Sequence, residues 1–397
     1  MKILEVKWFV NNMIRVNKYL NTIPDAIITK YLELGSNPDV ISLGIGEPDF
    51  STPYHIREAA IEALTLGKTF YTPAKGLLGL RKEIAHTLSR KYQLEYEPNH
   101  EILVTIGASE AIEISLITLL NVGDEVIIVS PSYLSYEPIV KMCGGIVVNI
   151  ETKEKDGFKL TKEALSAKLS DKTRLILLNY PNNPTGAIMN QDELDEIASV
   201  LRDRDLHVIS DEIYSELNYT KKHASIANSD GMFEKTIVIN GFSKTYAMTG
   251  WRLGYVCATK EIIDILSKYH QYAILCAPTI SQFAGIEALK NGDRSIETMR
   301  DEYDMRRRFV VERLNSMGLS TSNPLGAFYV FINIKSTHLT STEFCDQLLE
   351  NKKVVLIPGH AFGASGEGFV RLSYSYSIQH LKEGLNRIDA FIQELNL

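Results

Sequence analysis

The stretch TIVINGFSKTYAMTGWRLGYVCA, residues 236–258, places two apolar, β-branched runs on either side of a single lysine, Lys244. The runs KTIVINGF (235–242) and RLGYVCA (252–258) are typical of strands that are buried on both faces of a sheet. Lys244 therefore lies at the end of a predicted strand, and the next charged residue is Arg252. A surface lysine usually lies among other polar groups, so this apolar setting indicates a functional side chain.

Four further runs of the same kind precede this stretch, and segments of helical periodicity such as 109–120 and 191–204 lie between strands. Strands that alternate with helices predict an α/β domain with a mainly parallel sheet and helices on both faces. In such sheets ligands bind at the carboxyl ends of the strands. The four runs are EILVTIG (101–107), EVIIVSP (125–131), RLILLNYP (174–181) and HVISDEI (207–213).

The length of 397 residues is too great for one simple core. After a long charged helix pattern around 290–317, which we predict to be a hinge, strand candidates at 326–334, 354–359 and 368–375 and a final helix replace the alternation. This change indicates a smaller α+β domain. The predicted division is an N-terminal segment at 1–48 that joins the small domain, a large domain at 49–290 and a small C-terminal domain at 291–397.

The composition excludes several kinds of partner. A net charge of −7 and a pI of about 5.8 argue against nucleic acid, because phosphate binding needs a basic surface. No window reaches about 18 uncharged apolar residues, so we predict no membrane span, and the amphipathic residues 1–20 do not resemble a signal peptide. Without a CxxC pair or zinc-like spacing, we expect free thiols, no metal and a cytoplasmic protein. The cysteines are Cys143, Cys257, Cys276 and Cys345.

Polar residues follow several of the predicted strands. GASEAIEI (107–114) places Ala108 and Ser109 between a strand and a helix, where backbone N–H groups and a hydroxyl suit a phosphate. The same pattern is a common helix N-cap, so it does not decide the matter alone. In NYPNNPTGA (179–187), Asn183 is held by the proline that follows, although a bare turn also explains these residues.

Three charged residues lie where an ion is costly. Asp211 follows a buried run and needs a cation or several donors, so a salt bridge to an arginine would also explain it. Arg371 lies inside the strand candidate FVRLSYS, and a buried guanidinium can hold a carboxylate through two hydrogen bonds. A desolvated Lys244 would have a lowered pKa, which makes its neutral amine a nucleophile toward a carbonyl.

These features are a phosphate cradle, a nucleophilic lysine, a buried carboxylate, an aromatic platform and a carboxylate clamp. They are the components that pyridoxal phosphate needs to act on amino acids. The chain resembles the class I/II aminotransferases, the aspartate-aminotransferase-like, fold-type I enzymes of pyridoxal phosphate. The similarity extends from ISLGIGEPDF (41–50) to the last helix. It implies a large cofactor-binding domain with a mainly parallel sheet flanked by helices, and a smaller α+β domain.

The resemblance implies a role for each matched residue. Lys244 matches the lysine that forms the Schiff base and moves the proton between the substrate Cα and the cofactor. Asp211 matches the acid that keeps the pyridine nitrogen protonated, while Tyr214 and Asn183 match residues that hydrogen-bond the cofactor O3′. Tyr133, in SPSYLSY, matches the ring that stacks on the pyridine. The phosphate-binding positions are matched by Ala108, Ser109, Ser243 and Arg252, and the substrate-carboxylate contacts by Gly46, Asn183 and Arg371.

Two matched positions bear on assembly and affinity. Tyr71, in YTPAKGLLGLR (71–81), matches a tyrosine that reaches the phosphate of the other subunit, which implies a homodimer with shared active sites. Three positions before Lys244, where many relatives carry a hydroxyl residue, this chain has Gly241. The resemblance therefore implies that one phosphate donor is lost, or replaced by water or backbone.

A closer similarity points to the bacterial subgroup of N-acetyl-LL-diaminopimelate aminotransferases, which shades into aromatic and aspartate aminotransferases. We expect transfer of an amino group from an L-amino acid to a 2-oxo acid, which we expect to be 2-oxoglutarate, by a ping-pong mechanism. The sequence does not reveal the amino donor. The motifs that carry this similarity are GFKLT (157–161), SDEIYSEL (210–217), HASIA (223–227) and HQYAILCAPTISQ (270–282).

The main alternative is a β-C–S lyase on the same fold, which would use the same residues but eliminate from Cβ. A transcription regulator that fuses this fold to a winged helix is disfavoured, because the enzyme pattern begins within the first fifty residues and the net charge is negative. A structural protein that has lost catalysis is disfavoured by the intact set Lys244, Asp211, Tyr214, Asn183 and Arg371.

Overall fold

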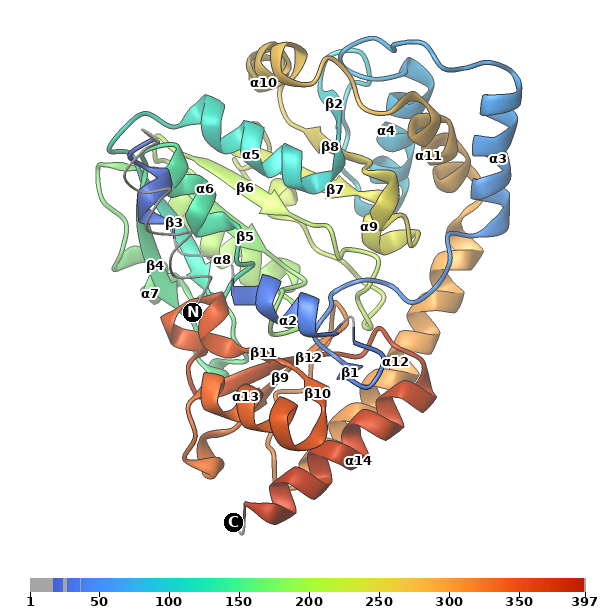
Figure 1. Ribbon diagram of the computed structural model, residues 1–397. Coiled ribbons are helices and arrows are strands. Elements are labelled where there is room, and N and C mark those ends of the chain that lie inside the picture. Colours follow the sequence, from blue (N-terminus) through green and yellow to red (C-terminus); the bar gives the residue numbers. More distant parts are fainter. Residues whose placement is uncertain (1–16, 24–26, 36, 396–397) are drawn as a thin grey trace.

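The computed structural model describes residues 17–23, 27–35 and 37–395. Figure 1 shows a twisted sheet enclosed by helices, with a smaller group of strands and helices beside it. Residues 1–16 of the predicted N-terminal segment lie outside the described ranges.

The large sheet has the strand order β2-β8-β7-β6-β5-β3-β4. Within the part β7-β6-β5-β3-β4, adjacent strands are parallel. The strand β8 is antiparallel to both of its neighbours, β7 and β2. The prediction of a mainly parallel sheet is therefore confirmed. The strands are β2 (Ile102–Thr105), β3 (Glu125–Ser130), β4 (Ile146–Glu151), β5 (Thr173–Asn179), β6 (His207–Asp211), β7 (Thr236–Gly241) and β8 (Gly254–Cys257).

Helices cover both faces of this sheet, as its continuously apolar strands require. On one face α5, α6 and α10 pack against the central strands. On the other, α3, α4 and α11 cover β2, β8 and β7, while α7 and α8 cover β3, β5 and β6. These helices are α3 (Tyr54–Thr65), α4 (Leu78–Tyr92), α5 (Gly107–Leu119), α6 (Tyr136–Met142), α7 (Lys162–Ser166), α8 (Gln191–Leu201), α10 (Lys260–Ala273) and α11 (Thr279–Asn291).

The strand register brings polar residues together at the carboxyl edge of the sheet. Asn179 on β5 pairs in register with Asp211 on β6, which in turn pairs with Ile239 on β7. The chain leaves β7 at Gly241 and enters the one-turn helix α9 (Phe242–Thr245), which carries Lys244. The fold thus places two of the predicted functional groups on neighbouring strand ends.

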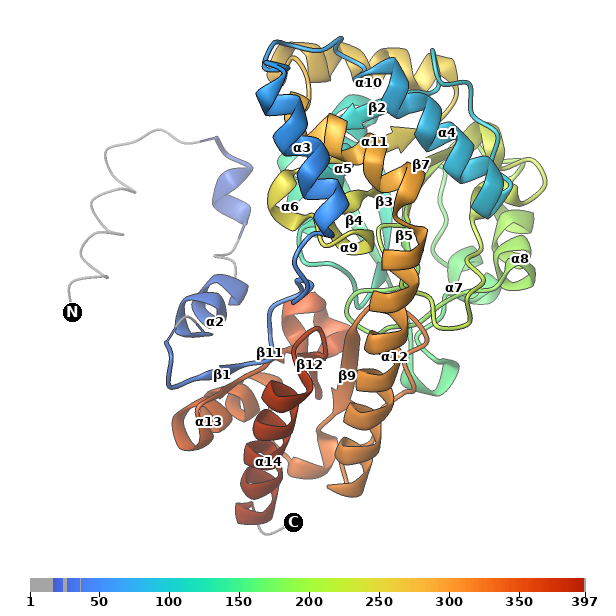
Figure 2. The same ribbon diagram turned by 90° about the vertical axis from the view of Figure 1, so that its right-hand side faces the viewer.

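The smaller group is built on an antiparallel sheet in the order β11-β12-β9. The long helix α12 leads into it from the large sheet, and Figure 2 shows α12 running beside β9 and α14. A second, two-stranded sheet pairs β1 with β10 in parallel. The elements are α12 (Asp293–Ser316), β9 (Tyr329–Asn333), α13 (Ser341–Lys352), β10 (Val354–Val355), β11 (Ile357–Pro358), β12 (Phe369–Ser373), α14 (Ile378–Glu394) and β1 (Ile41–Ser42).

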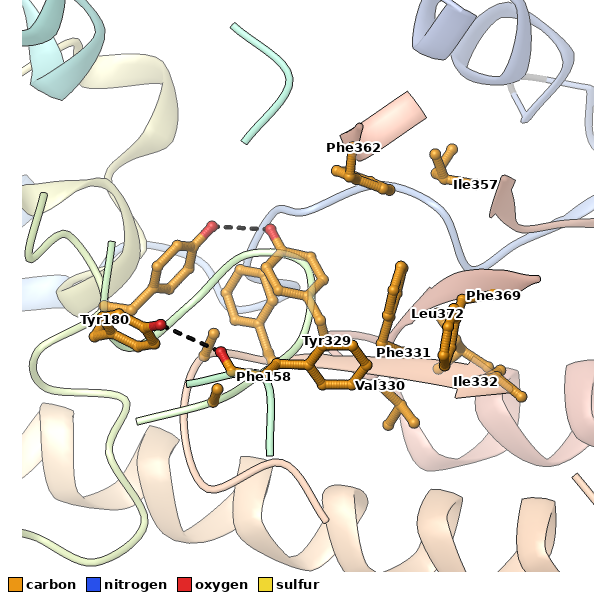
Figure 3. Close-up of a cluster of buried hydrophobic side chains, with 14 of the residues drawn as sticks. Phe158, Tyr180, Tyr329, Val330, Phe331, Ile332, Ile357, Phe362, Phe369 and Leu372 are labelled. Atoms are coloured by element: carbon orange, nitrogen blue, oxygen red, sulfur yellow. Dashed lines mark hydrogen bonds between the residues drawn. The ribbon is translucent and has the colours of Figure 1, made fainter. Parts of the chain in front are cut away.

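An aromatic cluster joins the two groups of elements (Figure 3). Phe331 on β9 and Phe369 on β12 stack with their ring centroids 4.9 Å apart, and Phe158 from the large sheet's side meets both edge-on. Aromatic rings in these geometries add about 0.5–1.5 kcal/mol per pair beyond the burial of their area. The cluster therefore fixes β9 and β12, which carry Tyr329 and Arg371, against the large sheet.

The six predicted strands of the α/β pattern are all present, but β4 was missed. The division into domains stays a prediction. The predicted joining of the N-terminal segment to the small domain agrees with the contacts of α2 (Ile27–Gly35). Its residues Lys30 and Tyr31 hydrogen-bond Asp346 of α13 at 2.8 and 3.1 Å. Among the described residues, no helix combines the length and apolar character that a bilayer crossing requires.

Candidate active site

A cleft of about 310 Å³ opens at the carboxyl ends of β5 and β6 and beside β9 and β12. Every site residue predicted from the sequence lines it except Tyr71. The predicted residues in its lining are Gly46, Ala108, Ser109, Tyr133, Asn183, Asp211, Tyr214, Ser243, Lys244, Arg252 and Arg371. The structure thus brings these residues together, while the role of each stays a prediction.

Lys244 reaches across the cleft from α9. Its Nζ donates a hydrogen bond of 2.6 Å to the carbonyl oxygen of Gly46, in the segment that follows β1. The pKa of Lys244 is lowered to about 8, chiefly by burial; the cations Arg371 and Arg252 contribute to the lowering, and nearby carboxylates oppose it. The neutral amine is therefore accessible near neutral pH, which is what a nucleophile or a general base requires.

Asp211 ends β6 with its carboxylate in the cleft wall. Its Oδ2 accepts a hydrogen bond of 2.6 Å from the Tyr136 hydroxyl, and its Oδ1 accepts one of 3.2 Å from the backbone N–H of Ile213. Burial raises the pKa of Asp211 to about 6, and these two hydrogen bonds oppose that rise. No arginine of the described ranges pairs with this carboxylate, so the alternative of a salt bridge to arginine is not supported for Asp211.

Asn179 organises this edge of the sheet, although the sequence did not single it out. Its Nδ2 donates to the backbone oxygen of Asp211 at 2.9 Å, and its Oδ1 accepts from the backbone N–H of Asn183 at 3.0 Å. One buried amide therefore sets the spacing between the strand end at Asp211 and the turn at Asn183.

The far end of the cleft is suited to an anion. The helix α5 begins at Gly107, and its N-cap residue supplies no side-chain hydrogen bond, so the first-turn N–H groups at Ala108 and Ser109 are available. A Cβ on Gly107, whose φ is +74°, would lie 2.8 Å from the guanidinium of Arg252. Backbone and cation can approach this closely because residue 107 is glycine.

Gly241 was predicted to cost a phosphate donor, and its surroundings explain the small residue. A Cβ there would lie 3.0 Å from the backbone oxygen of Leu253 and 3.1 Å from the Cα of Gly254. The close pairing of β7 with β8 therefore leaves little room for a side chain. Thr249, in the turn before Arg252, brings another hydroxyl into the cleft lining.

Arg371 lies at the opposite end, on β12, and is 2% exposed. Its Nη1 donates to Oδ1 of Asn183 at 2.8 Å, and its Nη2 donates to the carbonyl oxygen of Gly44 at 2.7 Å. The rings of Tyr329 and Phe362 lie 4.4 and 4.7 Å from the guanidinium carbon. Its Nε has no hydrogen-bond partner among the described residues, so this buried cation retains a donor for an anionic ligand.

Tyr329 connects the two ends of the site and was also missed in the sequence. Its hydroxyl lies 2.9 Å from that of Tyr214, while its ring packs on Arg371. A Cβ on Gly46 would lie 2.0 Å from the Tyr329 oxygen, so glycine is needed for this close approach. Tyr329 therefore fixes the positions of Tyr214, Arg371 and the segment around Gly46.

Tyr71 does not line the cleft of its own chain, and its side chain is 82% exposed. The loop that carries it is anchored by Gln282, which donates to Thr72 Oγ1 and accepts from the N–H of Leu77 at 2.9 and 2.7 Å. The exposed Tyr71 thus lies outside the cleft of its own chain, on a loop that Gln282 holds in place.

The missed residues have one common feature. Tyr136, Asn179 and Tyr329 contact other residues of the site, and each belongs to an apolar or turn-like sequence that packing alone would explain. The sequence places Tyr136 only three positions after Tyr133, and the two rings meet edge-to-face in the structure.

The family model described as "Aminotransferase class I and II" matches residues 38–388. An aspartate aminotransferase of Pyrococcus abyssi is 47% identical over 362 residues, which cover 90% of this chain and 93% of that protein. A probable N-acetyl-LL-diaminopimelate aminotransferase of Bacillus subtilis is 45% identical over 92% of each chain.

Solved structures give the same result. The crystal structure of an aromatic aminotransferase from Pyrococcus horikoshii OT3 superposes with a TM-score of 0.88 at 47% identity, covering 92% of this chain and 99% of that one. The similar proteins carry three different donor names, but all are aminotransferases. The lyase alternative is accordingly not favoured.

Proposed function

The chain belongs to the class I and II aminotransferases, which depend on pyridoxal phosphate, and from this premise we propose how its own residues perform the transfer. The enzyme moves an amino group from an amino acid to a 2-oxo acid. The observation that carries the proposed assignment of roles is the convergence of Lys244, Asp211 and Arg371, from three distant parts of the chain, on one cleft.

The residues of the cleft fit pyridoxal phosphate. The uncapped start of α5 and the guanidinium of Arg252 suit its phosphate, and the buried carboxylate of Asp211 suits a protonated ring nitrogen. Tyr133 offers an aromatic face in the same lining, and Tyr214 and Asn183 offer polar groups for the ring hydroxyl. When bound, the cofactor supplies an electron sink that stabilises negative charge at the substrate Cα.

Lys244 is the proposed nucleophile and proton carrier. Since its pKa is lowered to about 8, an appreciable fraction of the amine is neutral at physiological pH. The neutral Nζ would hold the bound cofactor covalently and, once displaced by the amino substrate, would accept the proton from Cα. Its hydrogen bond to Gly46 supports this role, because Nζ reaches the segment after β1 on the opposite side of the cleft.

Arg371 is the proposed clamp for the substrate α-carboxylate. Its fork is oriented by Asn183 and Gly44 and is covered by two aromatic rings, so the geometry is set before the substrate arrives. A carboxylate beside this weakly hydrated guanidinium exchanges hydrogen bonds with water for charge-assisted hydrogen bonds. The same contact serves both half-reactions, because the amino donor and the 2-oxo acceptor share an α-carboxylate.

The side-chain end of the cleft favours an apolar, aromatic donor over aspartate. The charged residues in the described lining are Asp211, Lys244, Arg252 and Arg371, and each has a proposed partner in the cofactor or the α-carboxylate. Ile45 and Leu134 lie beside the aromatic residues of the same lining. With no uncommitted cation in the described lining, the second carboxylate of aspartate, or of the proposed acceptor 2-oxoglutarate, must depend on neutral donors or on groups outside that lining.

A homodimer completes the proposed site. Tyr71 is matched to a phosphate contact but is exposed, and an open hollow of about 630 Å³ adjoins the phosphate end and shares Thr249 and Arg252 with the cleft. A second copy that placed its own Tyr71 in this hollow would reach the phosphate. The exposed apolar residues near the loop support such an interface: Tyr54, Ile61, Leu64, Leu66, Phe70 and Tyr272.

The direct test is a spectral half-reaction. The cofactor-bound enzyme is mixed with single amino acids, and the conversion of the pyridoxal absorbance to that of the pyridoxamine form is recorded. We expect phenylalanine and tyrosine to convert the cofactor faster than aspartate, and 2-oxoglutarate to restore the first spectrum. Release of pyruvate from cystathionine, without amino transfer, would contradict the proposal.

A further inference from the structure

Tyr136 is the first residue of α6 and has no role in the function described so far. Its side chain is fully buried among apolar residues, yet its hydroxyl belongs to the lining of the cleft. There it donates the 2.6 Å hydrogen bond to Oδ2 of Asp211. A buried hydroxyl in an apolar wall requires a partner, and the partner of this one is the carboxylate to which we assign the ring nitrogen of the cofactor.

The direction of this hydrogen bond is fixed by the two groups. Burial, together with the neighbouring charge of Asp211, raises the pKa of Tyr136 well above its usual value, so the phenol keeps its proton. An ionised carboxylate only accepts, and the phenol therefore donates to it. Protonation of Asp211 would weaken this arrangement, because the hydrogen bond is strongest to the charged form.

Asp211 has few other groups that favour its charged form. The backbone N–H of Ile213 bonds the other carboxylate oxygen at 3.2 Å, and Lys244 contributes an opposite charge from α9. Glu212 disfavours the charged form of Asp211, because its own negative charge raises the pKa of Asp211. Tyr214 lines the same side of the cleft. Without the phenol, Oδ2 would lose the shorter of the two hydrogen bonds.

Tyr136 also contacts the predicted platform for the cofactor ring. The rings of Tyr133 and Tyr136 meet edge-to-face, with centroids 5.4 Å apart and planes at 81°. Because the two rings are in contact, a shift of the Tyr136 ring would also displace the Tyr133 ring. One side chain thus touches both the acid and the aromatic group assigned to the cofactor.

We propose that Tyr136 is a positioning residue, whose hydroxyl holds the Asp211 carboxylate ionised and in one orientation while its ring supports Tyr133. This inference rests on the proposed function, in which Asp211 serves the ring nitrogen of the cofactor. It assigns Tyr136 no contact with the substrate. Its effect on the reaction passes entirely through Asp211 and Tyr133.

The test begins with Tyr136→Phe, which keeps the ring and its contact with Tyr133 but removes the hydroxyl. We expect the dissociation constant for pyridoxal phosphate to rise about tenfold, the value of one charge-assisted hydrogen bond. The acidic limb of the pH profile for Cα proton removal in single turnovers should move upward by about one pH unit, because Asp211 then takes up its proton more readily.

The control is Tyr180→Phe. It removes another buried hydroxyl, which donates to the carbonyl of Phe158 at 3.2 Å and accepts from Leu160 N–H at 3.0 Å, away from the cleft (Figure 3). This variant tests whether the loss of any buried phenol hydroxyl disturbs the enzyme. We expect a lowered melting temperature and unchanged cofactor affinity and pH profile.

A double-variant cycle with Asp211→Asn separates a positioning role from a structural one. If the phenol acts through the carboxylate, Tyr136→Phe should change the cofactor dissociation constant less than about twofold in the Asp211→Asn background. An equal tenfold change in both backgrounds, or an unmoved pH profile in the single variant, overturns the inference. Failure of the wild-type enzyme to convert its cofactor with any amino acid would instead refute the proposed function.

Discussion

Asp211 and Glu212 are adjacent, buried carboxylates with different surroundings. Glu212 accepts hydrogen bonds from Ser210 Oγ at 2.8 Å and Ser225 Oγ at 2.5 Å, and its second oxygen lies 2.8 Å from His223 Nε2. Asp211 has the Tyr136 hydroxyl and one long backbone hydrogen bond, and it faces the cleft. Glu212 therefore has three hydrogen-bonding side chains around its carboxylate, whereas the carboxylate of Asp211 has two hydrogen bonds and faces the cleft.

This difference assigns a structural role to Glu212 and a ligand-binding role to Asp211, although the two are adjacent in the sequence. A buried carboxylate with a full set of donors stabilises the fold, and little would be gained by adding a ligand. A buried carboxylate with few donors is costly by itself and becomes favourable when a cationic ligand binds. The same contrast holds for Arg371, whose Nε has no hydrogen-bond partner in the part of the chain that the structure describes. Four variants and a pH series test the contrast.

The largest effect is expected at Lys244, on the cleft side. Lys244→Ala removes the nucleophile and proton carrier, so turnover should fall by about 10⁴-fold and the near-visible absorbance of the cofactor-bound enzyme should disappear. Lys91→Ala is the matched control, since Lys91 is ion-paired with Glu216 and Asp293 at 2.9 Å. It should keep both signals. If Lys244→Ala kept both its turnover and its near-visible absorbance, Lys244 would not have the assigned role.

Asp211→Ala should also act on function more than on folding. Removal of the acid leaves the ring nitrogen of the cofactor without its partner, so we expect the rate of Cα proton removal in single turnovers to fall by about 10²–10³-fold. Cofactor affinity should weaken as well. Because the isolated carboxylate is costly to bury, the urea midpoint of the cofactor-free protein should change little. Unchanged single-turnover kinetics would remove Asp211 from its assigned role.

Glu212→Ala should show the reverse pattern. It leaves Ser210, Ser225 and His223 without their shared acceptor, and we expect the free energy of unfolding of the cofactor-free protein to fall by about 3 kcal/mol in urea titration. The cofactor dissociation constant of the folded fraction should stay within about threefold of wild type. A loss of cofactor affinity as great as that of Asp211→Ala would erase the distinction between the two carboxylates.

The smallest effect concerns the pH at which the cofactor binds. The pKa of Lys244 is lowered to about 8 in the cofactor-free protein, and the nucleophile is the neutral amine, which gains population as pH rises. The second-order rate of reconstitution should therefore increase about tenfold between pH 7 and pH 9 and then level off. Stopped-flow absorbance measures it. A rate that still rises through pH 10 would indicate an unperturbed lysine.

Much of the fold was predictable because local patterns carry it. The strands β3, β5, β6 and β7 are buried on both faces and appear in the sequence as continuous apolar runs. β4 was missed because it is an edge strand whose short apolar run is interrupted by Asn149, and five of its six residues are partly or fully exposed. The place of Lys244 after β7 followed from the sequence directly.

The site was predictable where a residue's own setting is unusual, as for Lys244, Asp211 and Arg371. It was not predictable where a role arises from long-range contact. Tyr136 meets Asp211 across 75 positions, and Arg371 meets Asn183 across 188. Neither spacing leaves a trace in a single sequence, since both tyrosine and asparagine are equally explained by packing or by a turn.

The most direct measurement asks which lysine holds the cofactor. The cofactor-bound enzyme is reduced with borohydride, which fixes the covalent bond, and its peptides are then mapped by mass spectrometry. The account predicts that the pyridoxyl mass is found on Lys244, in the peptide that contains GFSK. The same mass on another lysine, or an unmodified Lys244 in fully loaded enzyme, would contradict it.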